Sequence, residues 1–230
     1  MFTCGAVTGV SLSAPASVAG FYGELLGWRL DGGVLSDADG VSVAALLAGT
    51  DGWSLTLDGA ADRVVAEGGQ LLGERLAADP AGVRFGLGAA DVPLPPPGPG
   101  RPAWFEHMST DPAAADGFYP AVFGCGLAPA GPSYAVFLAG ERPVAGRLAQ
   151  APELAGAVGE RWMVYLAHAD VDAGATAAQR LGGIVAVPPS DTPTGRLAAV
   201  VDPAGAVFTL LTPGSGAAPG QGESAGRERG

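Results

Sequence analysis

The chain contains no lysine and only two histidines and two cysteines among its 230 residues. Its basic side chains are 12 arginines, set against 23 acidic residues, and the formal net charge is −11. Nucleic acids and anionic membranes bind clustered lysine and arginine, so this balance argues against both partners. The cysteines, Cys4 and Cys125, are far apart and lack metal-binding or redox spacing, which favours buried thiols over a disulfide.

Long apolar runs are also missing. No segment approaches the roughly 18 consecutive apolar residues that indicate a membrane span, and the start lacks the basic-then-apolar pattern of a secretory signal. Hydrophobic residues make up 48% of the chain and charged residues 15%, which is sufficient for a buried core. We therefore expect a cytoplasmic globular protein. Abundant alanine, glycine and proline, without lysine, is typical of a GC-rich, actinobacterial genome.

A helical pattern occurs twice in the chain. The segment 21–28 (FYGELLGW) has a counterpart at 118–125 (FYPAVFGC). In each case apolar residues follow the spacing i, i+3, i+4, i+7 and i+8, which predicts a short amphipathic helix. The two stripes are Val18, Phe21, Tyr22, Leu25 and Leu26, and Ala115, Phe118, Tyr119, Val122 and Phe123. Pro15 and Pro112 stand near the expected starts, and Gly27 and Gly124 near the ends.

A second pattern, an Asp-Pro-Ala-Gly turn between apolar strands, also occurs twice. It occupies residues 79–82 and 202–205 and predicts two hairpins. Each hairpin follows a double glycine and another short helix, and Asp170 is expected to cap the helix of the second half. Residues 187–194 are rich in proline and predict an additional loop in that half.

These repeats predict two similar domains, an N-terminal one at residues 1–92 and a C-terminal one at 103–213. Residues 93–102 (PLPPPGPGRP) predict a semi-rigid linker between them. Residues 214–230 contain mainly glycine, alanine, proline and charged residues and predict a disordered tail. The first domain is expected to be trimmed, with shorter strands or loops around its pocket.

The segments 104–124 and 164–213 resemble the opening and closing modules of the vicinal-oxygen-chelate superfamily, which includes glyoxalases, bleomycin-resistance proteins and dioxygenases. The first half shows a weaker similarity over residues 6–90. The resemblance implies an α+β fold of tandem βαβββ modules, with curled mixed sheets around concave pockets. Two such domains imply a pseudo-dimer within one chain, acting as a monomer or a homodimer. Some members of the family are metal-dependent lyases, isomerases or dioxygenases, and others only sequester a drug.

The same resemblance assigns the positions where the family holds its metal ion. In the second half these positions are Trp104, Met163 and Thr209, and in the first half they are Val7, Ser54 and Gly86. Divalent metals require several converging imidazole, carboxylate or thiolate groups, which these residues do not supply. We therefore expect neither a metal ion nor another cofactor.

The side chains of a strand that starts at Trp104 alternate between its two faces. Glu106 is then expected to point into the pocket, and His107 toward the helices or solvent. Two interpretations of Glu106 remain open. It could be a general base or hydrogen-bond acceptor with a pKa raised by apolar surroundings, or an exposed or arginine-paired carboxylate. Tyr165 is a second candidate catalytic residue for acid–base chemistry.

The expected ligand-binding residues fall into two groups. In the C-terminal domain, aromatic, methionine and aliphatic side chains suit a flat apolar ligand; this group is Trp104, Met108, Met163, Tyr165, Val207, Thr209 and Leu211. In the N-terminal domain, Arg84 could bind a carboxylate or phenolate, or form a salt bridge with an acidic residue, for which Asp58 is the obvious partner if it also points inward. Ser54 completes that group.

Three functions are compatible with this sequence. The leading hypothesis is a metal-independent pocket protein that binds a small aromatic or hydrophobic molecule, such as a bacterial natural product, for sequestration or biosynthetic handling. The second is a cofactor-independent tailoring enzyme, a lyase, cyclase or oxygenase, that uses Glu106, Tyr165 or Arg84. The third is a metal-dependent glyoxalase or extradiol dioxygenase.

Overall fold

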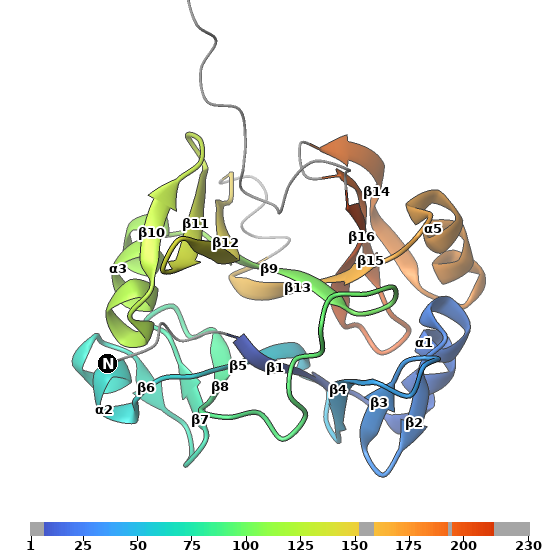
Figure 1. Ribbon diagram of the computed structural model, residues 1–230, viewed down its shortest axis with the longest axis horizontal. Helices are drawn as coiled ribbons and strands as arrows, with labels where there is room; N and C mark the ends of the chain where they lie inside the picture. The colour runs from blue at the N-terminus through green and yellow to red at the C-terminus, as the bar shows by residue number, and fades with distance from the viewer. Residues whose placement is uncertain (1–6, 152–158, 193–194, 214–230) are drawn as a thin grey trace, which may run out of the picture.

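The computed structural model describes residues 7–151, 159–192 and 195–213 of the chain (Figure 1). Within this part, the chain alternates short helices with many strands, in agreement with the expected α+β class. Cys125 is half-buried, whereas Cys4 and the expected disordered tail lie outside the described residues. None of the described helices is long and apolar enough to cross a membrane.

The first half contains two successive βαβββ modules. Their elements are β1 (Val7–Ser13), the 3-10 helix η1 (Ala16–Val18), α1 (Ala19–Leu26), β2 (Arg29–Asp31), β3 (Val34–Ser36), β4 (Ser42–Leu47), β5 (Gly52–Leu57), α2 (Ala61–Ala66), β6 (Gln70–Leu71), β7 (Leu76–Ala78) and β8 (Arg84–Leu87). All eight strands form one sheet in the order β2-β3-β4-β1-β5-β8-β7-β6.

The second half repeats this plan with mostly longer strands. Its elements are β9 (Pro102–Ser109), α3 (Pro112–Phe123), β10 (Gly126–Pro129), β11 (Tyr134–Ala139), β12 (Arg142–Ala149), β13 (Arg161–Ala167), α5 (Val171–Arg180), β14 (Ile184–Thr192), β15 (Gly195–Val201) and β16 (Val207–Pro213). The strand order, β10-β11-β12-β9-β13-β16-β15-β14, is equivalent to that of the first half.

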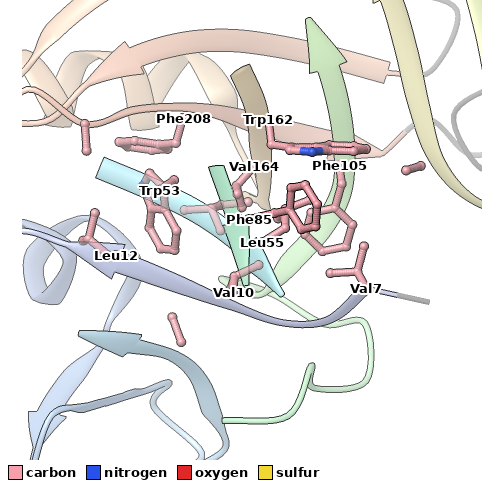
Figure 2. Packing of buried hydrophobic residues seen from close by; sticks show 14 of the residues in the cluster. Val7, Val10, Leu12, Trp53, Leu55, Phe85, Phe105, Trp162, Val164 and Phe208 are labelled. Carbon is pink, nitrogen blue, oxygen red and sulfur yellow. The ribbon is translucent and has the colours of Figure 1, made fainter. Parts of the chain in front are cut away.

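The two sheets curl in opposite directions and pack back to back (Figure 1). The pair β9 and β13 lies against β1 and β5 at the centre, while α1 packs beside α5 and α2 beside α3. Apolar side chains from the outer faces of both sheets fill the space between them (Figure 2). Trp53, Phe85, Phe105, Trp162 and Phe208 belong to this shared core. The inner, concave faces of the sheets therefore point away from each other.

Buried hydrogen bonds connect the helices of each half to the hairpin of the other. Tyr22 of α1 donates to Asp202, which opens the β15–β16 turn, at 2.9 Å. Tyr119 of α3 donates to Asp79, at the equivalent turn of the first half, also at 2.9 Å. Each tyrosine oxygen also accepts an indole N–H, from Trp53 in one case and from Trp162 in the other. The halves are therefore joined by two matching polar clusters inside the apolar core.

The predicted helix ends are confirmed. Gly27 and Gly124 end α1 and α3 with φ of 74° and 67°, a left-handed conformation that glycine adopts without a steric penalty. The side chain of Asp170 caps α5 by accepting from the Ala173 N–H at 3.0 Å. Both Asp-Pro-Ala-Gly turns connect antiparallel strands, as predicted.

Two expectations were wrong. Residues 187–192 are part of strand β14 rather than a loop. Because β14 is the edge of its sheet and its register shifts at Val187, Pro188 and Pro189 need not donate ladder hydrogen bonds. The first-half counterpart of Trp104 is Gly9 instead of Val7, since Gly9 pairs with Thr56 as Trp104 pairs with Tyr165. A shorter connection to α1 and an irregularity in β1 between Val7 and Gly9 cause this difference.

Candidate functional site

The inner face of the C-terminal sheet collects large side chains from its central strands. Trp104, Glu106 and Met108 alternate along β9, and their partners on β13 are Tyr165, Met163 and Arg161. Thr209 of β16 lies beside Tyr165 and places Val207 and Leu211 on the same face. The structure therefore brings together all seven ligand-binding residues expected in this half. Within this group Trp104, Met163, Thr209 and Leu211 are buried.

Glu106 lies at the centre of this face and is buried. The Tyr165 hydroxyl donates to its Oε1 at 2.8 Å. Burial raises the pKa of Glu106, and hydrogen bonds from Tyr165 and Tyr134 reduce this shift without cancelling it. Burial and the neighbouring Glu106 also raise the pKa of Tyr165, so its hydroxyl keeps its proton and remains a donor. Of the two interpretations of Glu106, the buried acceptor matches this geometry and the exposed or arginine-paired carboxylate does not.

Tyr134 is a member of this site that the sequence did not identify. It lies on β11, and its hydroxyl accepts from the Trp104 indole at 3.2 Å. Gly146 of β12 lies directly opposite Glu106, and a side chain at Gly146 would collide with the Tyr134 hydroxyl. The absence of a side chain at Gly146 therefore makes room for Tyr134. Only the pairing of β11, β12 and β9 reveals this arrangement, because no local motif marks Tyr134.

The inner face does not offer the donor set of a divalent metal site. Glu106 is a carboxylate, but its neighbours Trp104, Met163 and Thr209 supply an indole, a thioether and a hydroxyl. Zinc, iron and manganese sites in proteins use several imidazole, carboxylate or thiolate ligands. No group of three or more His, Cys, Asp or Glu side chains converges anywhere in the described part of the chain. These residues therefore do not fit a catalytic metal ion.

His107 points to the opposite side of β9, into the core between the halves. It is 1% exposed, and its Nε2 lies 3.3 Å from Oδ2 of Asp79. Its ring also packs against Tyr119 and Trp162. By the sheet registers, Ser11 of the first half is equivalent to Glu106. The next residues in the two strands are Leu12 and His107, so Leu12 occupies the first-half position that corresponds to His107. His107 is thus a structural residue of the interface, away from the inner face.

The N-terminal sheet lines a cavity of about 690 Å³, to which residues 160–162 of the C-terminal half also contribute. Ser54 and Arg84 line this cavity, whereas Asp58 is not among its lining residues. The expected Arg84–Asp58 pair was wrong. Asp58 follows the end of β5 and is exposed, and the carboxylate nearest to Arg84 belongs to Asp51, at 3.8 Å. Of the two interpretations of Arg84, the structure shows the salt bridge, with Asp51 rather than Asp58 as the partner.

We expect the substitution Glu106→Gln to stabilise the protein at neutral pH. A carboxyl with a raised folded-state pKa contributes stability below its unfolded pKa, and loses it as pH rises through the folded value. Glutamine keeps the acceptor for Tyr165 and has no charge to bury, so we expect a gain of roughly 1 kcal/mol at pH 7 and none near pH 3. Urea unfolding at both pH values measures this. The exposed Glu141→Gln is the control, and an equal effect of the two substitutions would contradict the prediction.

The fold defines a class of protein in which paired βαβββ modules form two curled sheets, each with a concave inner face (Figure 1). Residues 104–211 match the family model of the glyoxalase-like domain. The chain belongs to the vicinal-oxygen-chelate superfamily, as its resemblance to glyoxalases and dioxygenases indicated.

Individual relatives agree with this assignment. A Mycobacterium bovis protein named as a glyoxylase, CFP32, is 33% identical over 233 residues, which cover 84% of this chain and 88% of the relative. The anthracycline biosynthesis protein DnrV of Streptomyces peucetius is 39% identical over 142 residues, covering 58% of this chain and 50% of that protein. Among solved structures, the Mn(II)-bound glyoxalase of Novosphingobium aromaticivorans matches with a TM-score of 0.59 and 15% identity, over 92% of this chain and 82% of that chain. This last likeness concerns the fold.

Proposed function

We propose that the protein binds a small, largely aromatic molecule on the inner face of its C-terminal sheet, without a metal ion. The observation that carries the proposal is the convergence of Trp104, Tyr134 and Tyr165 around the buried Glu106. Aromatic side chains bind flat ring systems by stacking, and methionine adapts to irregular ligand edges. The paired polar groups at the centre can orient a phenol or a carbonyl.

The type of ligand follows from this chemistry and from one relative. The C-terminal inner face combines apolar walls with a carboxyl acceptor and tyrosine hydroxyls, which suits a hydroxylated polycyclic compound. DnrV is named for the biosynthesis of anthracyclines, which are fused-ring aromatic compounds, and this supports a ligand of that kind. In a bacterium such a protein would sequester a natural product or present a biosynthetic intermediate.

Thermal unfolding in the presence of quinizarin, a dihydroxyanthraquinone, tests the proposal. A ligand that binds the native state raises the melting temperature by mass action. We expect an increase with quinizarin that is the same in protein treated with a chelator and in protein supplied with Mn²⁺. Elemental analysis of protein purified without chelators provides the second measurement. A stoichiometric divalent ion, or binding that requires one, would overturn the metal-free proposal.

A cofactor-independent enzyme of natural-product biosynthesis is the alternative, and the position of Glu106 favours it. A buried carboxyl with a raised pKa, 2.8 Å from a tyrosine hydroxyl, can accept or return a proton during a lyase, cyclase or oxygenase reaction. Glu106→Gln separates the two functions. A binding protein keeps most of its affinity for quinizarin, whereas an enzyme loses its turnover and keeps its substrate affinity.

A further inference from the structure

The hydrogen bonds around Glu106 all run in one direction, toward its carboxylate. The Tyr165 hydroxyl donates to Glu106 at 2.8 Å and accepts a hydrogen bond from the Thr209 hydroxyl. The Tyr134 hydroxyl also donates to Glu106, and it accepts from the Trp104 indole at 3.2 Å. Both tyrosine protons are therefore used by Glu106 and are not available to a ligand.

Glu106 itself can still accept hydrogen bonds. A carboxylate has about four acceptor positions, and the tyrosine hydroxyls use two of them. A ligand at the centre of this face is therefore held most strongly through a group that donates to Glu106. A ligand that offers only acceptors, such as an ether or a carboxylate, finds no unused donor in this network of side chains.

The charge of Glu106 has no counter-ion on this face. Glu106 is 7% exposed and forms no ion pair with any residue that the structure describes. Arg161 is the other charged residue that β9 and β13 place on the inner face, beside Met108. Its guanidinium lies close to Gly159 and does not pair with Glu106. Two neutral hydroxyls reduce the cost of burying the carboxylate without cancelling it, so a bound cation would supply the missing charge.

The surroundings of Glu106 also favour a cation. Aromatic rings attract a neighbouring positive charge, and Trp104, Tyr134 and Tyr165 bring three rings to this site from three different strands. The formal net charge of −11 raises the concentration of cations near the protein. The N-terminal sheet lacks this arrangement, because Ser11 occupies the position equivalent to Glu106.

We propose that the C-terminal site recognises an aromatic molecule through a protonated amine, which donates hydrogen bonds to Glu106 while the ring system packs against Trp104. This inference rests on the proposed function and narrows the ligand to an organic amine. Tyr134 and Tyr165 are then positioning residues, because they hold the carboxylate in place and do not donate to the ligand.

Calorimetric titration with three matched probes tests this proposal. Naphthalenemethylamine carries a cation, naphthalenemethanol a neutral hydroxyl donor and naphthoate an anion, each on the same carbon of the same ring system. We expect the amine to bind about tenfold more tightly than the alcohol at neutral pH, because a charge-assisted hydrogen bond is about twice as strong as a neutral one. Naphthoate should bind more weakly than both. Equal affinity of the amine and the alcohol, or tighter binding of naphthoate, would reject the proposal.

The substitution Glu106→Gln identifies the group that binds the amine. Glutamine keeps the shape and one acceptor but has no charge, so the amine should lose its advantage of about tenfold over the alcohol. The exposed Glu141→Gln is the control and should keep this advantage. An amine preference that survives Glu106→Gln would place the amine elsewhere and overturn the proposal.

The pH dependence of amine binding provides a test on the unmodified chain. The amine stays protonated between about pH 4 and 8, as do Arg161 and both tyrosines. Since Glu106 must be ionised to bind a cation, amine affinity should rise with pH through the pKa of Glu106, which burial raises. Tyr165→Phe should move this rise to higher pH, because it removes a hydrogen bond that lowers the pKa. An amine affinity that does not change with pH would contradict the proposal.

Quinizarin, which has no amine, distinguishes failure of this inference from failure of the proposed function. If quinizarin raises the melting temperature and the amine binds no more tightly than the alcohol, the aromatic site stands and its amine specificity is rejected. If neither quinizarin nor the amine binds, both proposals are rejected.

Discussion

We expect Asp79→Ala to lower the free energy of unfolding by about 3–5 kcal/mol, because alanine leaves several buried hydrogen-bond donors without an acceptor. Asp79 is 3% exposed. One of its oxygens accepts from the backbone N–H groups of Ala81 and Val83, at 3.0 and 2.8 Å. The other accepts from Tyr119 at 2.9 Å and lies 3.3 Å from His107 Nε2. Alanine leaves all of these groups buried without an acceptor.

The pseudo-symmetry of the chain supplies a matched control. Asp202 makes the same turn contacts and accepts from Tyr22, but Leu12 stands where the second half has His107. Asp202→Ala should therefore be less destabilising than Asp79→Ala by about 1 kcal/mol, the net value of one more buried polar contact. Adding His107→Leu to Asp79→Ala should recover a similar amount. Equal losses in the two aspartate variants would show that His107 contributes nothing to the interface.

The pH dependence of the free energy of unfolding gives an independent measurement of the contribution of Asp79. Burial alone raises the pKa of Asp79, but His107, the Val83 N–H and Tyr119 outweigh it and lower the pKa below its usual value. A lowered pKa contributes stability above the unfolded value, which is lost as pH falls through the folded value. Urea unfolding between neutral and acidic pH should show this loss in the wild type, and a smaller loss in Asp79→Ala.

For the second large effect, we expect Trp104→Ala to weaken quinizarin binding roughly 30-fold, or about 2 kcal/mol, as for other aromatic residues at the centre of binding sites. Trp104 is buried at the centre of the inner face, and its indole N–H holds the Tyr134 hydroxyl at 3.2 Å. Its removal eliminates the stacking surface and releases Tyr134 from its position near Glu106. Both losses weaken the same site.

Two conservative variants make this prediction specific. Trp104→Phe keeps a stacking ring and loses one hydrogen bond, so affinity should fall by only about fivefold. Trp28→Phe removes an indole that is buried in the other half and donates to the Gly100 carbonyl at 2.7 Å, so affinity should not change. Fluorescence titration with quinizarin, together with melting temperatures, measures all three. An unchanged affinity in Trp104→Ala would place the ligand elsewhere.

Local sequence patterns predicted most of the secondary structure around the site. These patterns depend on residues that are close in sequence, so they can be predicted without knowledge of the fold. They are the apolar stripes of α1 and α3, the glycines that end these helices, and the two Asp-Pro-Ala-Gly hairpins. The alternation along β9 likewise separates Glu106 from His107. The partners of these residues could not be predicted from local sequence, because Tyr134 and Asp79 come from strands and turns elsewhere in the chain.

The double glycines also have one role that local sequence indicates and another that only the tertiary structure shows. Gly69 and Gly183 belong to the double glycines that come before the two predicted hairpins. In the structure, a side chain at Gly69 would collide with Phe118 of the other half, and one at Gly183 would press against Phe21. These glycines therefore also let the helices of one half approach the hairpins of the other. No pattern within one half reveals a contact of this kind.

The sequence by itself determined the repeated modules, the helices and hairpins within them, and the shortage of metal-binding side chains at the family's ligand positions. These depend on residue types and on interactions over a few positions. Only the tertiary structure decided that Tyr134 joins Glu106, that Gly9 replaces Val7 in register, and that tyrosines of each half hydrogen-bond to aspartates of the other. The physical reason is that strand register and the packing of two sheets depend on contacts between distant segments, which local propensity does not encode.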